Sequence, residues 1–111
     1  MTIKYYNKLV RDKIPAIITK AGSTYETEVL GEKEYLEKLN EKLNEELEEF
    51  YNATPEETVG EIADILEVLY ALAETKGISI EEIEKVRLQK REDRGGFKKR
   101  ILLKHVVETN R

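Results

Sequence analysis

The chain has 111 residues, of which 38% are charged, and a formal net charge of −4. This length fits one domain, spanning residues 1–111, and leaves little room for a second. The charged fraction and the absence of a run of about 20 apolar residues exclude a membrane-spanning chain. The acidic balance argues against binding to nucleic acid through a basic surface.

The residue inventory limits the available chemistry further. The chain has no cysteine, and His105 is its only histidine. Disulfides, thiolate metal sites and catalysis by several imidazoles are therefore excluded. Because the N-terminal residues lack the apolar stretch of a secretory signal, we expect a cytoplasmic protein.

The predicted elements begin with a short helix from about Asp12 to Ala21. Residues 24–30 are rich in β-forming side chains and predict a short strand. A long helix is then expected from about Glu32 to Asn52, because leucines and Phe50 recur at spacings of three and four.

Capping signals predict the starts of the next two helices. Thr54-Pro55-Glu56-Glu57 starts a helix that runs to about Lys76, and Ser79-Ile80-Glu81-Glu82 starts one that runs to about Asp93. The apolar, β-branched residues 101–107 predict a second strand that could pair with the first. We therefore expect an all-α fold, an antiparallel bundle of about four helices with a small two-stranded β ribbon, completed by dimerisation.

Acidic residues gather on the two central helices. On the first, Glu45, Glu46 and Glu49 form the pattern Glu-Glu-x-x-Glu. Glu46 lies about 60° from the middle of the leucine stripe, and Glu49 about 120° to the same side. On the second, Glu61 and Asp64 are three residues apart on an apolar face, so their side chains can converge.

Carboxylates in an apolar setting need a charge that cancels theirs. An isolated ionised group would take up a proton there, and two carboxylates about 4 Å apart repel by roughly 4 kcal/mol at an effective dielectric of 20. The cancelling charge can come from Lys and Arg side chains or from a hard metal ion. With oxygen ligands alone, Mg²⁺ or Mn²⁺ is favoured over Zn²⁺. The alternatives are a solvated acidic face and ion pairs with lysines of the last helix.

These residues resemble the motif of the MazG-type all-α nucleoside triphosphate pyrophosphohydrolases, with Glu-Glu-x-x-Glu on one helix and Glu-x-x-Asp on the next. Residues 6–15 (YNKLVRDKIP) and 90–97 (KREDRGGF) resemble the terminal signatures of the phosphoribosyl-ATP pyrophosphohydrolase-like subgroup. The likeness covers nearly the whole chain. It departs from the subgroup at Gly60, where another Glu is frequent.

The resemblance implies roles for the five acidic residues as catalytic residues. Glu46, Glu49, Glu61 and Asp64 would bind Mg²⁺, and Glu45 would be their partner or a general base. The implied reaction is hydrolysis of a nucleoside triphosphate by metal-activated water at the α–β phosphate bond, giving a nucleoside monophosphate and pyrophosphate. A homodimer or dimer of dimers is also implied, with the site near the subunit contact.

A triphosphate brings about four negative charges, so cations of the protein must also contact it. The candidate substrate-binding residues are Lys8, Arg11, Lys90, Arg94, Gly95, Gly96 and Lys98. The glycines would let backbone N–H groups approach phosphate closely. The alternative for Lys90 and Arg94 is a favourable contact with the dipole of their own helix.

Three functions remain open at this point. The first is hydrolysis of standard or damaged nucleoside triphosphates, and the second is the same chemistry on phosphoribosyl-ATP in histidine biosynthesis. The third is a non-catalytic helical interaction module with a solvated acidic face. A substrate panel separates the first two. Asp64→Asn separates the third, because a scaffold would tolerate that change and show no dependence on Mg²⁺.

Overall fold

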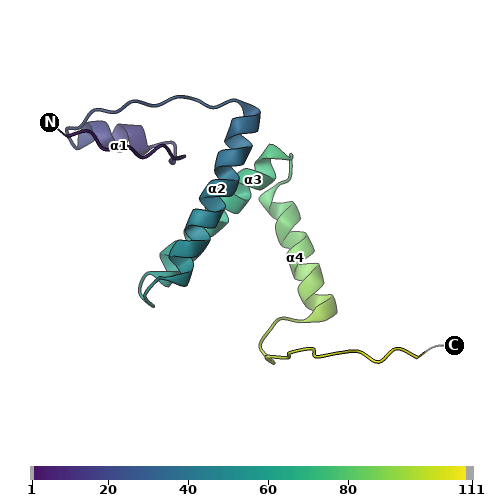
Figure 1. Ribbon diagram of the computed structural model, residues 1–111. Coiled ribbons are helices and arrows are strands. Elements are labelled where there is room, and N and C mark those ends of the chain that lie inside the picture. The colour runs from purple at the N-terminus through teal and green to yellow at the C-terminus, as the bar shows by residue number, and fades with distance from the viewer. Residues whose placement is uncertain (1, 110–111) are drawn as a thin grey trace. The chain divides into compact units, whose positions relative to one another are not determined.

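A computed structural model describes residues 2–109 and contains four helices in that range (Figure 1). They are α1 (Ile14–Lys20), α2 (Glu32–Tyr51), α3 (Thr58–Thr75) and α4 (Ile80–Arg94). The chain divides into two compact units, Met1–Ile78 and Ser79–Arg111, so that α1 to α3 belong to the first and α4 to the second. The all-α prediction is confirmed.

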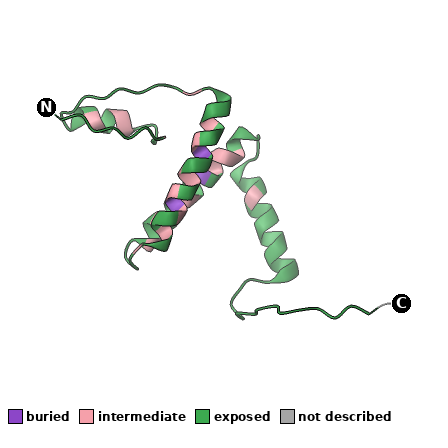
Figure 2. Ribbon diagram, viewed as in Figure 1, coloured by how far each residue is buried: buried purple, intermediate pink, exposed green. Residues whose placement is uncertain are grey.

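The packed part of the first unit is the pair of helices α2 and α3. After a short connection α3 runs back along α2, as expected for antiparallel neighbours (Figure 1). Leu39 of α2 and Val68 of α3 are 3% and 8% exposed, and they are the buried apolar residues within residues 2–109. Glu46 is buried with them, and Figure 2 shows the buried positions in purple on this pair. The interface therefore encloses a carboxylate as well as apolar side chains.

α3 carries more apolar surface than α2 covers. Its apolar residues Val59, Ile62, Leu66 and Leu69 are between 41% and 78% exposed. In the sequence, Ile65, Val68 and Leu72 form a second apolar face on this helix, which predicts that it is buried on most sides. In the first unit, one face of α3 packs on α2 and the apolar face formed by these four residues stays exposed.

Local hydrogen bonds set the helix starts. α4 begins where predicted, because Ser79 Oγ accepts a hydrogen bond from the Glu82 N–H at 3.1 Å. α3 begins at Thr58, one turn later than predicted. Glu57 does bond back to the Thr54 N–H at 2.9 Å, which lowers the pKa of the Glu57 carboxyl. Residues 55–57, however, form a turn rather than the first turn of the helix.

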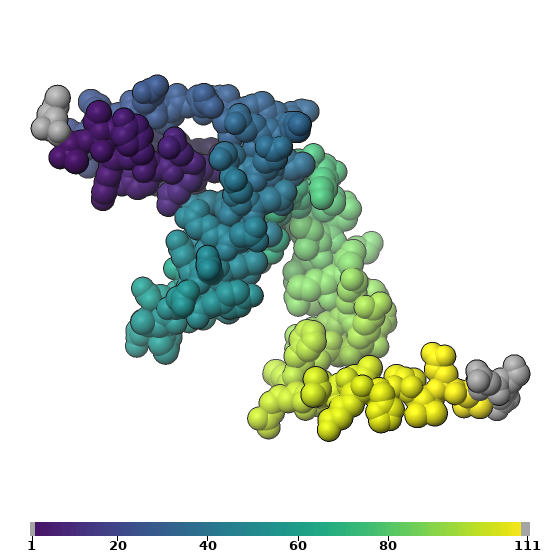
Figure 3. Space-filling model, in the orientation of Figure 1, coloured from purple at the N-terminus to yellow at the C-terminus, as the bar shows by residue number. Residues whose placement is uncertain are grey.

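The predicted two-stranded ribbon is wrong. No strand is present between residues 2 and 109, and the segments 24–30 and 101–107 are irregular and almost entirely exposed. Figure 3 shows the segment after α4 as a narrow yellow run of atoms. β-forming residues make a strand only when a neighbouring strand supplies hydrogen bonds. Composition alone therefore overstated the β structure.

None of the four helices in the described part of the chain combines the length and apolar character that crossing a bilayer requires.

Candidate metal centre

Three carboxylates from α2 and α3 meet where the two helices pack. Glu46 of α2 and Glu61 and Asp64 of α3 each place one oxygen within 4.8 Å of the other two. The spacing of three residues puts both α3 carboxylates on one side of that helix. The structure thus brings together three of the predicted site residues, which we call the acidic cluster.

Two oxygens of the acidic cluster are buried and lack a partner. Oε2 of Glu46 and Oε2 of Glu61 have no hydrogen-bond partner among residues 2–109. Buried polar atoms are almost always hydrogen-bonded, and an unsatisfied one costs free energy. The two oxygens therefore have the surroundings of ligand atoms whose partner is an ion.

The surroundings of Glu46 raise the pKa of its carboxyl above the ordinary value. Burial is the largest cause, and repulsion from Glu49 is the second. A hydrogen bond and the positive charge of Lys42 lower this pKa, while the charge of Asp64 raises it further. The pKa is raised because these surroundings disfavour the ionised form of Glu46. A cation at the acidic cluster would favour that form.

Lys42 and Lys8 neutralise part of the acidic charge on α2. The Nζ atom of Lys42 lies 3.4 Å from Glu46 Oε1 and 3.7 Å from Glu45 Oε1. The Nζ atom of Lys8 lies 3.2 Å from the same oxygen of Glu45 and 5.9 Å from the centre of the Tyr6 ring. Lys42 was not among the predicted site residues, although spacings of three and four residues on one helix indicate such pairs.

Arg11 reaches the acidic cluster from the segment before α1. Its Nη2 atom donates a hydrogen bond of 2.7 Å to Asp64 Oδ1. Arg11 and Lys8 were predicted to contact substrate phosphate, and in the structure both contact carboxylates of the predicted catalytic set. Neither reaches the unpartnered oxygens of Glu46 and Glu61.

Glu45 and Glu49 lie beside the acidic cluster. Glu45 is half-buried and holds Lys8 and Lys42. Glu49 is exposed and stands outside the group of three, one turn beyond Glu46, where its charge still raises the pKa of Glu46. The roles of Glu45 as a base and of Glu49 as a ligand stay predictions.

The donor atoms of the acidic cluster fit a hard divalent cation. All of them are carboxylate oxygens, the type that Mg²⁺ and Mn²⁺ prefer. The two buried unpartnered oxygens point to an ion as the missing partner. Glu46, Glu61 and Asp64 would hold it.

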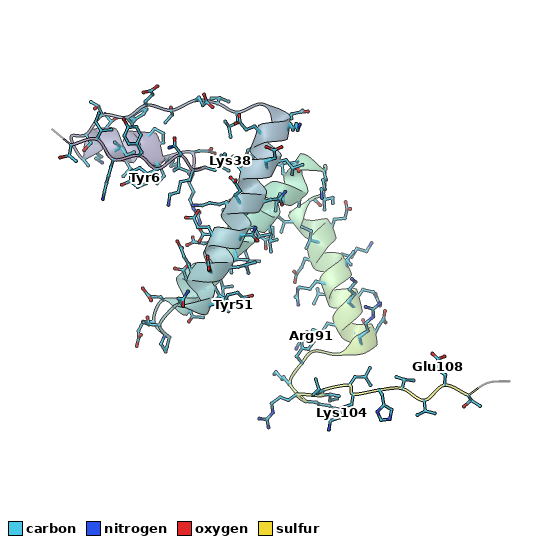
Figure 4. All side chains as sticks on the ribbon, viewed as in Figure 1. Tyr6, Lys38, Tyr51, Arg91, Lys104 and Glu108 are labelled. Carbon is cyan, nitrogen blue, oxygen red and sulfur yellow. The ribbon has the colours of Figure 1, made fainter. Side chains whose placement is uncertain are left out.

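Arg94 at the end of α4 and Lys98 after it, two of the predicted cations, line a pocket in the second unit. Its volume is about 320 Å³, and the lining residues are Arg91, Arg94, Gly95, Gly96, Lys98, Lys99 and Ile101. We call it the basic pocket. Four predicted substrate-binding residues line it, whereas Lys90 does not. Arg91, labelled in Figure 4, and Lys99 were not predicted.

The two glycines shape the basic pocket. Gly95 ends α4 with φ 82° and ψ −178°, a conformation that is nearly restricted to glycine. At Gly96 an added Cβ would lie 3.5 Å from the Arg91 guanidinium, an ordinary van der Waals distance, so the guanidinium lies near the backbone there. The Gly95 N–H donates to the Arg91 carbonyl at 2.8 Å, so it is the cations lining the pocket that suit an anion.

Comparison with known families gives a match over most of the chain. The family described as phosphoribosyl-ATP pyrophosphohydrolase matches residues 5–91. The matched range holds the acidic cluster, Glu45, Glu49, Lys8 and Arg11, and it ends before Arg94. No curated protein and no solved structure gives a significant match.

Proposed function

Since the chain belongs to the phosphoribosyl-ATP pyrophosphohydrolase family, and is thus a hydrolase acting on phosphoric anhydrides, we propose that its substrate is a nucleoside triphosphate. The bond cleaved is the one between the α and β phosphates, and the products are a nucleoside monophosphate and pyrophosphate. The observation that carries the proposal is the acidic cluster, with two buried oxygens that lack a partner. Such a site suits the divalent cation that accompanies a triphosphate.

The proposed cation is Mg²⁺, with Mn²⁺ as a possible replacement. Oxygen-only ligands support this choice. Glu46, Glu61 and Asp64 would hold the ion, and Glu49 is the fourth proposed ligand. When bound, the ion would lower the pKa of a water and offset phosphate charge.

Residues of the chain supply positioning and charge around the phosphates. Glu45, which pairs with Lys8 and Lys42, is the proposed general base that takes a proton from the attacking water. Cations offset the charge that grows on pyrophosphate as it leaves. The proposed phosphate-binding residues are Lys8, Arg11, Lys90, Arg94, Gly95, Gly96 and Lys98. Positioning and charge stabilisation of this kind carry most of the rate in phosphoryl transfer.

Phosphoribosyl-ATP is the second candidate substrate, and the description of the matching family favours it. Its hydrolysis breaks the same kind of bond, so the acidic cluster serves both substrates equally. The two candidates differ only in the group attached to the base.

The test is pyrophosphate release from a panel of nucleoside triphosphates and phosphoribosyl-ATP, with Mg²⁺ and with EDTA. We expect release only with the metal, and the best substrate then decides between the two candidates. If no member of the panel is cleaved with any metal, the enzymatic assignment is overturned and a helical interaction module takes its place.

We also propose that the chain forms a homodimer or a dimer of dimers. The exposed face of α3 formed by Val59, Ile62, Leu66 and Leu69 supports this, because contiguous apolar surface of this kind marks interfaces. Leu66→Asp should shift the sedimentation coefficient toward that of the monomer. A wild-type protein that sediments as a monomer at micromolar concentration would contradict the proposal.

A further inference from the structure

Lys8 and Arg11 lie on one short segment and reach two helices. Lys8 pairs with Glu45 of α2 at 3.2 Å, and Arg11 pairs with Asp64 of α3 at 2.7 Å. Asn7, just before them, has φ 48°, a bend that asparagine tolerates. This segment, residues 8–11, thus places two cations on carboxylates assigned to metal binding and catalysis.

The pair between Arg11 and Asp64 has the properties of a contact that exchanges easily. Its side chains are 58% and 41% exposed, whereas those of Lys42 and Glu46 are 20% and 8% exposed. Exposed ion pairs contribute little free energy. Residues 2–8 and 10–13 are exposed as well, so little packing holds Arg11 in place.

We propose that Arg11 and the divalent cation exchange at Asp64, an inference that rests on the proposed function. In the metal-free protein Arg11 neutralises Asp64. A divalent cation on Asp64 repels the guanidinium, and the released Arg11 binds a phosphate of the substrate. Arginine suits both positions, because its guanidinium bonds carboxylates and phosphates with the same forked geometry.

Exchange couples the two ligands of the site. The metal frees Arg11 for the triphosphate, and the triphosphate holds Arg11 away from Asp64. Each ligand therefore increases the affinity for the other, as linkage requires. Without substrate, Arg11 therefore lowers the affinity of the acidic cluster for the metal below that of the carboxylates alone.

The first arm of the test measures Mn²⁺ binding by electron paramagnetic resonance in the full chain without nucleotide. Arg11→Ala should bind Mn²⁺ about two- to fivefold more tightly than wild type, the factor that an exposed ion pair contributes. Lys13→Ala is the matched control, because it removes the same charge two residues along from an exposed side chain. Unchanged or weaker binding by Arg11→Ala, or equal tightening in both variants, overturns the proposal.

The second arm adds a nonhydrolysable α,β-methylene nucleoside triphosphate. Mn²⁺ should strengthen binding of this analogue to wild type, and Arg11→Ala should bind it about tenfold more weakly at saturating metal, since a hydrogen bond to a charged group is lost. Arg11→Lys, which keeps the charge without the fork, should fall between the two. Full affinity of Arg11→Ala for the analogue overturns the phosphate half of the exchange.

The metal arm needs no substrate, so its result is independent of the proposed reaction. If the protein releases no pyrophosphate but Arg11→Ala binds Mn²⁺ more tightly as predicted, only the proposed function is overturned. If wild type releases pyrophosphate but Arg11→Ala and wild type bind Mn²⁺ equally, only the proposed exchange at Asp64 is overturned. Circular dichroism of each variant checks that substitutions at these exposed positions leave the helices folded.

Discussion

The two units of the chain carry opposite charge at their candidate binding regions. In the first, α2 and α3 bring Glu46, Glu61 and Asp64 together. In the second, four Arg and Lys side chains line the basic pocket, and no carboxylate lines it. The two candidate sites therefore differ in the ligand that suits them, a cation in the first unit and an anion in the second.

The two regions also differ in how they are held. The acidic cluster lies in the packed α2–α3 interface, and Glu46 is 6% exposed. In α4 no residue is buried, and Figure 2 shows that helix in green apart from one half-buried position. Changes in the acidic cluster should therefore alter both stability and turnover, whereas changes at the basic pocket should alter substrate binding most and leave stability unchanged.

Glu61→Gln should have the largest effect, because it removes one of the two buried oxygens proposed to bind the metal. We expect turnover to fall at least about a hundredfold, since a catalytic metal ion contributes several kcal/mol. Glu67→Gln, on the same helix with an exposed side chain, is the control. Steady-state pyrophosphate release measures both, and less than a tenfold loss in Glu61→Gln would argue against a metal ligand.

Arg94→Ala should have a smaller effect, confined to the basic pocket. KM should rise about tenfold with a smaller change in kcat, because a charge-assisted hydrogen bond to substrate is lost. Lys104→Ala removes the same charge from an exposed residue outside the pocket, labelled in Figure 4. Equal rises in KM for both variants would show that net charge, not a phosphate site, is responsible.

The smallest of these effects should be the change that Glu46→Gln makes to the stability of the metal-free protein. Burial, then Glu49, raise the pKa of Glu46. Wild type therefore loses stability as the pH rises from the unfolded-state pKa through the higher folded-state pKa. The variant lacks this loss, so its Tm at about pH 8 should exceed that of wild type by a few degrees.

At about pH 3, more than one unit below the ordinary Glu pKa of about 4.3, the carboxyl is protonated in both states, and the difference in Tm should nearly vanish. Glu48→Gln, at an exposed position of the same helix, should leave the Tm unchanged. A lower Tm for Glu46→Gln at pH 8 in EDTA would show that ionised Glu46 stabilises the metal-free fold.

The helices could be predicted from the sequence because their signals are local. The leucine stripe of α2 and the Ser79 cap of α4 depend on residues within one or two turns. The convergence of Glu61 with Asp64 follows from the same spacing. The prediction of a β ribbon was wrong because strand pairing joins distant residues. The composition of residues 24–30 and 101–107 does not indicate whether either segment has a partner strand.

The charge partners inside the site were predicted less well. Lys42 was overlooked because a lysine in a Glu-rich helix usually pairs at the solvated surface, yet its Nζ atom reaches buried Glu46. Lys8 and Arg11 were assigned by charge to phosphate, and no sequence pattern indicated that carboxylates 37 and 53 residues away would hold them. Tertiary contacts over such separations have no local signal.

The assignment of the acidic cluster as the metal centre is tested most directly by pyrophosphate release from the best nucleotide substrate. Wild type and Asp64→Asn are compared, each with Mg²⁺ and with EDTA. If the acidic cluster holds the catalytic metal, wild type releases pyrophosphate with Mg²⁺ alone, and the variant loses nearly all of this activity while staying folded. Release by Asp64→Asn at the wild-type rate, or release by wild type in EDTA, would contradict the assignment of the acidic cluster as the metal centre.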